Sequence, residues 1–253
     1  ANDFTGNWTV TRGRLRVVSD AALGNAANDV IFNGTVEATT NNDTGDASIQ
    51  VTNGTNLNLG AGRDIVLNSG KEGTLYVWGG TTMTVTGKIT GAGQLRKEDG
   101  GILLLNNAAN DWAGNTTVVL GTVQLGAANV IPNGTGTGNV NLAAGTLNLN
   151  GFSETINGLT GSGSVNSGVA GAVTLTAGDN NATSTFSGVI QNGTGTVGLT
   201  KIGTGTQVLS AINTYTGGTI VDNGTLSITS NSGNSAIRGV LTVNAAGTVV
   251  TTG

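Results

Sequence analysis

The chain has 253 residues, of which 44 are glycine, 37% are hydrophobic and only 9% are charged, with a net charge of -4. Disordered chains combine low hydrophobicity with high net charge, so this composition excludes disorder and indicates a narrow aliphatic core. Ten scattered lysines and arginines exclude nucleic acid as a partner, because phosphates require a concentrated basic face. Cysteine and histidine are absent, which excludes disulfides, thiolate metal sites and a Ser-His-Asp mechanism.

Strand signals fill the chain, and helix signals are nearly missing. No segment of helical length carries the i, i+3, i+4, i+7 apolar pattern without a glycine or an Asn-Gly break. No run of 18 apolar residues exists, so no membrane insertion is expected. The first residues lack Met and have neither the basic region nor the apolar region of a signal peptide. We therefore expect a processed product or a piece of a longer protein. The clearest strands alternate apolar with polar residues and are predicted at 15–17, 75–77, 147–149, 226–228 and 241–243.

The spacing of glycines that precede strands predicts how these strands are arranged. Asn-Gly turns normally favour antiparallel hairpins. However, Gly-x-apolar openings follow one another at steps of 19 to 21 residues, as expected when each coil of a solenoid returns above the last. We therefore predict an all-β parallel solenoid with about 20–24 residues per coil. The openings in the first half are Gly13, Gly34, Gly54, Gly73 and Gly93.

A longer repeat is superimposed on the coils. An Asn-x-aromatic motif occurs three times, and a Gly-x-apolar strand begins eleven residues after each Asn. We interpret 1–253 as one continuous solenoid with units of approximately 1–108 and 109–211 and an incomplete unit at 212–253. The motif residues are Asn2, Asn110 and Asn213, the aromatic residues Phe4, Trp112 and Tyr215, and the strand-opening glycines Gly13, Gly121 and Gly224.

Segment 199–228 resembles the passenger-associated transport repeat, also called the autotransporter-associated β-strand repeat. Residues 95–125 resemble a degraded copy in which Glu98 and Asp99 replace part of a Gly-x-Gly turn, and residues 2–17 resemble the end of another copy. The resemblance implies a right-handed parallel β-helix in a large secreted or surface-displayed bacterial protein, with motif residues that are structural. The matching positions are Leu199, Lys201, Gly203, Gly205, Leu209, Asn213, Tyr215, Gly217, Gly218, Thr219, Gly224, Thr225 and Leu226.

A polysaccharide lyase or hydrolase is the rival interpretation, since such enzymes also use parallel β-helices. Their sites need clustered carboxylates, often with a basic residue. The candidates here are Asp43 with Asp46, Asp179 alone, and Glu98 with Asp99 beside Arg96 and Lys97. We expect these charges to keep loops soluble, and we predict no catalytic residue, no metal site and no cofactor.

Three further surface features have alternative interpretations. The aromatic residues Phe4, Trp112 and Tyr215 either stack on sugar rings or cover coil corners, and we favour the structural role. Thr-x-Thr segments at 82–86 and 174–176 raise a minor alternative, an ice-binding face. Arg12, Arg14 and Arg16 alternate along one predicted strand, and we expect a solvated strand face rather than an anion site.

The leading hypothesis is therefore a non-catalytic structural or adhesive segment, an extended stalk or a filament-forming solenoid, located outside the cell or on the bacterial surface. Solenoid ends carry unpaired backbone groups. We expect self-association head to tail through the terminal coils, or continuation into neighbouring repeats, with a glycan or cell-surface ligand as a further candidate partner.

Overall fold

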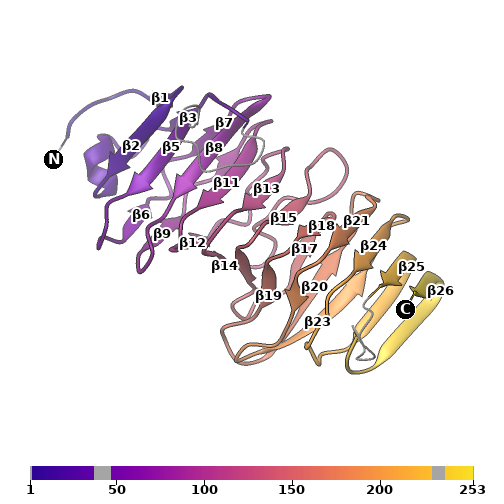
Figure 1. Ribbon diagram of the computed structural model, residues 1–253. Coiled ribbons are helices and arrows are strands. Elements are labelled where there is room, and N and C mark those ends of the chain that lie inside the picture. Colours follow the sequence, from indigo (N-terminus) through magenta and orange to yellow (C-terminus); the bar gives the residue numbers. More distant parts are fainter. Residues whose placement is uncertain (1, 37–46, 230–236, 253) are drawn as a thin grey trace. The chain divides into compact units, whose positions relative to one another are not determined.

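The computed structural model describes residues 2–36, 47–229 and 237–252, and almost all of their regular structure is strand (Figure 1). The one described helix is a single 3-10 turn, Asp20–Leu23. The chain divides into two compact units, residues 1–130 and 131–253. None of the described helical structure is long and apolar enough to cross a membrane.

Unit 1 consists of three parallel sheets, one for each face of the coil (Figure 1). Successive strands of a sheet come from successive coils, and the short strand β4 (Gly34–Thr35) departs from this rule by pairing antiparallel with β8. The first sheet holds β1 (Trp8–Val10), β3 (Val30–Phe32), β7 (Ile65–Leu67) and β10 (Ile89–Thr90). The second holds β2 (Gly13–Val17), β5 (Ala47–Val51), β8 (Lys71–Tyr76), β11 (Gln94–Glu98) and β13 (Thr116–Val118). The third holds β6 (Leu57–Leu59), β9 (Thr82–Val85), β12 (Ile102–Leu105) and β14 (Thr122–Leu125).

Unit 2 repeats this arrangement with longer final strands. β25 (Thr219–Ile228) bends around a corner, so its first half pairs with β23 and its second half with β24. β26 (Leu241–Thr251) follows β25 along both halves. The remaining strands are β15 (Val140–Leu142), β16 (Thr146–Asn148), β17 (Glu154–Ile156), β18 (Leu159–Gly161), β19 (Ser164–Asn166), β20 (Ala172–Ala177), β21 (Ser184–Phe186), β22 (Val189–Ile190), β23 (Thr196–Lys201) and β24 (Thr206–Leu209).

The core is a set of columns of identical register. Because side chains alternate between the two faces of a strand, every second residue points inward. In unit 1, Leu59, Val85, Leu105 and Leu125 occupy one such column, and each is at most 1% exposed. The predicted fold class, an all-β parallel solenoid, is confirmed.

The glycine register predicted from the sequence is wrong, although the coil length is close. Gly13 pairs with Ala47, and Gly34 pairs antiparallel with Glu72 instead of continuing the column of Gly13. Gly54 lies in a turn with a φ of 76°. The glycines therefore occupy different kinds of position in the coil, and their near-constant step does not mark one column.

We expect the inward columns to hold most of the stability of unit 1. Leu75→Ala removes a side chain that is 0% exposed on β8 and should lower the free energy of unfolding by about 2–5 kcal/mol. Leu120→Ala is the matched control, because Leu120 is 43% exposed, and it should change stability by less than about 0.5 kcal/mol. Urea denaturation measures both, and equal losses would contradict this core.

Candidate functional site

Lys97, in the degraded copy of the motif, points into the solenoid at a corner. It occupies the inward column below Leu75, and its side chain is 0% exposed. Its ammonium group donates hydrogen bonds to the carbonyl oxygens of Glu98 at 2.8 Å, Asp99 at 2.5 Å and Leu120 at 3.2 Å. Burial lowers the pKa of Lys97 to about 8, against the opposing attraction of the Asp99 and Glu98 carboxylates. The ammonium therefore joins two successive coils.

Lys201 forms the same corner in unit 2. Its ammonium group donates to the carbonyl oxygens of Ile202 at 2.6 Å, Gly203 at 2.8 Å and Asn223 at 3.3 Å. Burial lowers its pKa as well. Gly203 has a φ of 69°, and Asp99 takes the same left-handed conformation at the equivalent place, with a φ of 62°. Aspartate tolerates this region better than most residues, so the degraded copy keeps the corner without its glycine.

Gly121 and Gly224 lie against these lysine corners. Each has a positive φ, 70° and 65° respectively. A Cβ on Gly121 would lie 2.4 Å from the carbonyl oxygen of Asp99, and one on Gly224 would lie 2.4 Å from the carbonyl oxygen of Gly203. Two independent reasons therefore require glycine at these two positions: the backbone conformation and the close approach of the preceding coil.

The motif aromatics of the two full copies lie inside the solenoid. Trp112 is 1% exposed, and its Nε1 donates to Oγ1 of Thr116 at 3.1 Å. Tyr215 is 0% exposed, its hydroxyl lies 2.6 Å from Oγ1 of Thr219, and burial raises its pKa to about 12. Neither ring offers a face to a sugar. Phe4 differs, because it is 43% exposed and packs edge to face on another ring, that of Trp8.

The motif asparagines bind backbone groups. Oδ1 of Asn110 accepts from the N–H of Ile89 at 2.8 Å, and Oδ1 of Asn213 accepts from the N–H of Ile190 at 2.7 Å. The partners precede the asparagines by 21 and 23 residues, which is one coil. Asn2, whose Oδ1 accepts from the N–H of Phe4, is exposed. Leu199 is 2% exposed and pairs with Leu175 and Thr219.

Two buried polar residues were missed from the sequence. Arg63 is 0% exposed, pairs with the carboxylate of Asp20 at 2.7 Å and also donates to the carbonyl oxygen of Asn28. Gln207, 3% exposed, exchanges hydrogen bonds with the backbone of Leu159. Neither residue belongs to a repeated motif, so no periodic signal marks them.

Those carboxylates considered for catalysis that lie among the described residues do not gather into a metal-binding group. Asp43 and Asp46 lie outside the described residues. Arg96 binds the carboxylate of Glu98 at 2.6 Å, and Asp179 is a partly buried residue of unit 2. Among residues 2–36, 47–229 and 237–252, no three carboxylate or other metal-binding side chains are grouped closely enough to hold a metal ion.

The threonines considered for ice binding do not form a continuous array on β9. Thr82 pairs with Ile102, and Thr84 pairs with Leu104, so the next coil presents aliphatic side chains at the same places. In unit 2, Thr174 pairs with a glycine, Gly198. A flat threonine surface requires the pair on successive coils, and these registers do not supply it.

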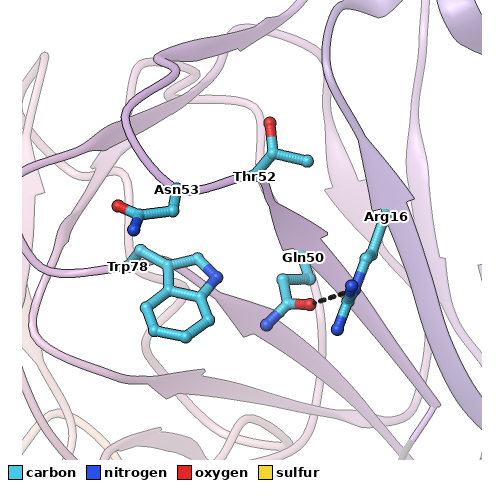
Figure 2. Close-up of a pocket in the computed structure, with 5 residues that line it drawn as sticks. All are labelled: Arg16, Gln50, Thr52, Asn53 and Trp78. Carbon is cyan, nitrogen blue, oxygen red and sulfur yellow. Dashed lines mark hydrogen bonds between the residues drawn. The ribbon is translucent and has the colours of Figure 1, made fainter.

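Two of the three arginines predicted to form a solvated strand face have partners, and the third, Arg12, is exposed. The guanidinium of Arg14 lies 4.4 Å from the centre of the Tyr76 ring, and Nε of Arg16 donates to Oε1 of Gln50 at 2.8 Å. Beside them is an outward-facing pocket of about 210 Å³ (Figure 2). It is lined by Arg16, Gln50, Thr52, Asn53 and Trp78.

The fold and its corners define a repeat-built β-solenoid whose motif residues satisfy its own backbone. Three segments, residues 1–17, 95–125 and 199–228, match the model of the Passenger-associated-transport-repeat family. The resemblance seen in the sequence is therefore confirmed, since these three segments match the passenger-associated transport repeat.

One curated relative is similar over most of this chain. It is named "Adhesin BmaC autotransporter", from Brucella suis biovar 1 (strain 1330), and is 30% identical over 248 residues. The alignment covers 89% of this chain and 6% of that protein. No solved structure matches the chain.

We expect the lysine corners to contribute to stability. Lys97→Met removes the ammonium from three carbonyl oxygens that are buried or part-buried, and it should lower the free energy of unfolding by about 1–3 kcal/mol. Lys201→Met should do the same in unit 2. Lys71→Met is the control, since Lys71 is partly exposed at the start of β8. Chemical denaturation compares the three variants. A corner variant as stable as the control would contradict the proposed corner role.

The corner should also show a defined pH dependence. The pKa of Lys97 is about 8 in the folded chain and 10.5 in the reference state, so the unfolded chain binds more protons between these values. The stability that this residue contributes is present above about pH 10.5 and is lost as the pH falls through about 8. The difference in unfolding free energy between the native chain and Lys97→Met should therefore widen from pH 7 to about pH 10. A constant difference would show that the lysine titrates normally.

Proposed function

We propose that this chain is a non-catalytic structural segment of a surface-displayed bacterial adhesin, in which it acts as a stalk. The observation that carries the proposal is the use made of the repeated residues. Lys97, Lys201, Asn110 and Asn213 all bind backbone groups of their own or an adjacent coil. The chemistry that these repeated residues share is thus directed at stacking coils, not at a substrate.

The comparisons support the location and the class. The repeat family is named for association with passenger transport, and the curated relative is named as an autotransporter adhesin. The chain spans 6% of the length of that relative. We propose display outside the cell on this basis, and a supporting role within a longer molecule.

We also propose that units 1 and 2 form one continuous solenoid that extends through its final strand. Val221 is buried in β25, and Val243 occupies the same register in β26 but is 46% exposed. An apolar inward position that is left exposed would be covered by another coil, which either further chain or a second copy could supply. Head-to-tail association of isolated chains follows from this.

The test applies small-angle X-ray scattering and sedimentation to the native chain and to a variant of the exposed final strand, Val243→Lys. We expect an elongated particle that associates as its concentration rises. Val243→Lys places a charge on the open coil and should leave a monomer, because the charge opposes pairing with another strand.

Val169→Lys is the matched control, because Val169 is 47% exposed outside any strand, and it should associate like the native chain. A compact particle, or two units that move independently, would overturn the stalk. A native chain that is monomeric at every concentration would overturn the open edge.

A further inference from the structure

The pocket on the outward face of unit 1 contains a buried polar group without a partner. Gln50 is 1% exposed, and its Oε1 accepts a hydrogen bond from Arg16 at 2.8 Å. Its amide nitrogen has no hydrogen-bond partner among the described residues. Figure 2 shows this nitrogen on the side toward Trp78, away from Arg16. Buried polar groups are nearly always satisfied, so an orphaned donor that faces a cavity indicates a ligand oxygen.

Trp78 supplies an aromatic wall next to this donor. It is 36% exposed, and it packs edge to face on Tyr76 with 6.0 Å between ring centres. Tyr76 is in turn covered by the guanidinium of Arg14 at 4.4 Å. The indole is therefore held by a stack of neighbours while part of it remains open to solvent. The negative face of such a ring attracts polarised C–H groups, which the face of a pyranose ring presents.

Arg16 gives the pocket its charge. It is the one charged residue among the five that line the cavity. Its Nε is occupied by Gln50, which fixes the plane of the guanidinium, and its terminal nitrogens form no hydrogen bond or ion pair with any described residue. A planar pair of N–H donors matches the two oxygens of a carboxylate.

From this geometry we propose that the pocket binds an acidic saccharide, a pyranose that carries a carboxylate. The sugar ring packs on Trp78, a ring or carboxylate oxygen accepts from the Gln50 amide, and the carboxylate pairs with Arg16. Thr52 and Asn53 offer further polar groups at the rim. A cavity of about 210 Å³ is smaller than the roughly 300–1,000 Å³ of sites for drug-sized ligands, so it suits one sugar residue of a longer glycan. This site goes beyond the proposed stalk function and does not depend on it.

The test measures binding of two acidic probes and their neutral counterparts to the full chain. Trigalacturonate and 3′-sialyllactose carry the carboxylate on different sugars, and maltotriose and lactose lack it. Amide chemical shifts in 15N-labelled protein report both affinity and place. We expect at least one acidic probe to bind roughly tenfold or more tightly than its neutral counterpart, with shifts centred on Gln50, Thr52, Asn53 and Trp78. The acidic probe that binds identifies the sugar class.

Variants assign the contacts. Arg16→Gln and Trp78→Ala should each weaken binding by roughly tenfold, and Arg16→Lys should fall between Arg16→Gln and the native chain. Arg12→Gln and Phe4→Ala remove an exposed arginine and an exposed aromatic from the same unit outside the pocket, and should bind within about twofold of the native chain. Trp78→Phe replaces Trp78→Ala if the alanine variant does not fold.

Several results would overturn the site. One is the absence of shifts with both acidic probes, and another is equal binding of neutral and acidic probes, which removes the role of Arg16. A further such result is binding that survives both Arg16→Gln and Trp78→Ala, or shifts that lie on unit 2. Loss of binding in the controls equal to that in the pocket variants would also place the ligand elsewhere.

Discussion

The structure depends on one constraint, which is that the backbone must turn sharply at each corner of a coil without leaving buried carbonyl groups unsatisfied. Parallel strands pair through evenly spaced hydrogen bonds along each face, but at a corner the chain leaves the ladder. The carbonyls of Glu98, Asp99 and Leu120 converge there, and the buried ammonium group of Lys97 donates a hydrogen bond to each of them. Lys201 repeats the solution in unit 2 with the same number of bonds. Burying a cation costs free energy, and the lowered pKa of the lysine reflects that cost. Lysine is nevertheless suited to this place, because its long side chain reaches from one coil to the next and carries three donors.

Other motif residues follow from this corner. Since the ammonium draws two coils together, the chain that passes beside it has no room for a side chain, and Gly121 and Gly224 occupy that place. The aromatic that precedes each of these strands is buried inside the solenoid, and its polar atom binds the hydroxyl of a threonine four residues later, Thr116 or Thr219. The lysine and the glycine are thus parts of one corner, and the threonine that binds the aromatic pairs with the strand that carries the lysine, which links the three recurring residues.

This coupling also decides what the sequence can predict. Strand type, solenoid architecture and the recurring motif follow from local alternation and from repetition, and those interpretations agree with the structure. The pairing register of the strands could not be predicted from the glycine spacing, because glycine occurs at several different corners of the coil. Gly34 therefore looked equivalent to Gly13 although it lies in an antiparallel strand. Arg63 and Gln207 occur once each, and their burial depends on partners 35 to 48 residues away. The outward pocket was likewise not predicted, because Arg16, Gln50 and Trp78 come from three coils and share no motif.

Inward and outward positions of this solenoid are under different physical demands. Inward residues stack on the same column in the next coil, so a change at Leu75 is felt by Ile49 above it and by Lys97 below it. Outward residues of the same strands do not belong to these columns. Arg96 and Glu98 form an ion pair there, whereas the equivalent positions in unit 2 are Thr200 and Ile202. The repeat can therefore keep its interior while its outward positions differ from one unit to the next, and the pocket formed by Arg16, Gln50 and Trp78 consists of such unrepeated outward residues.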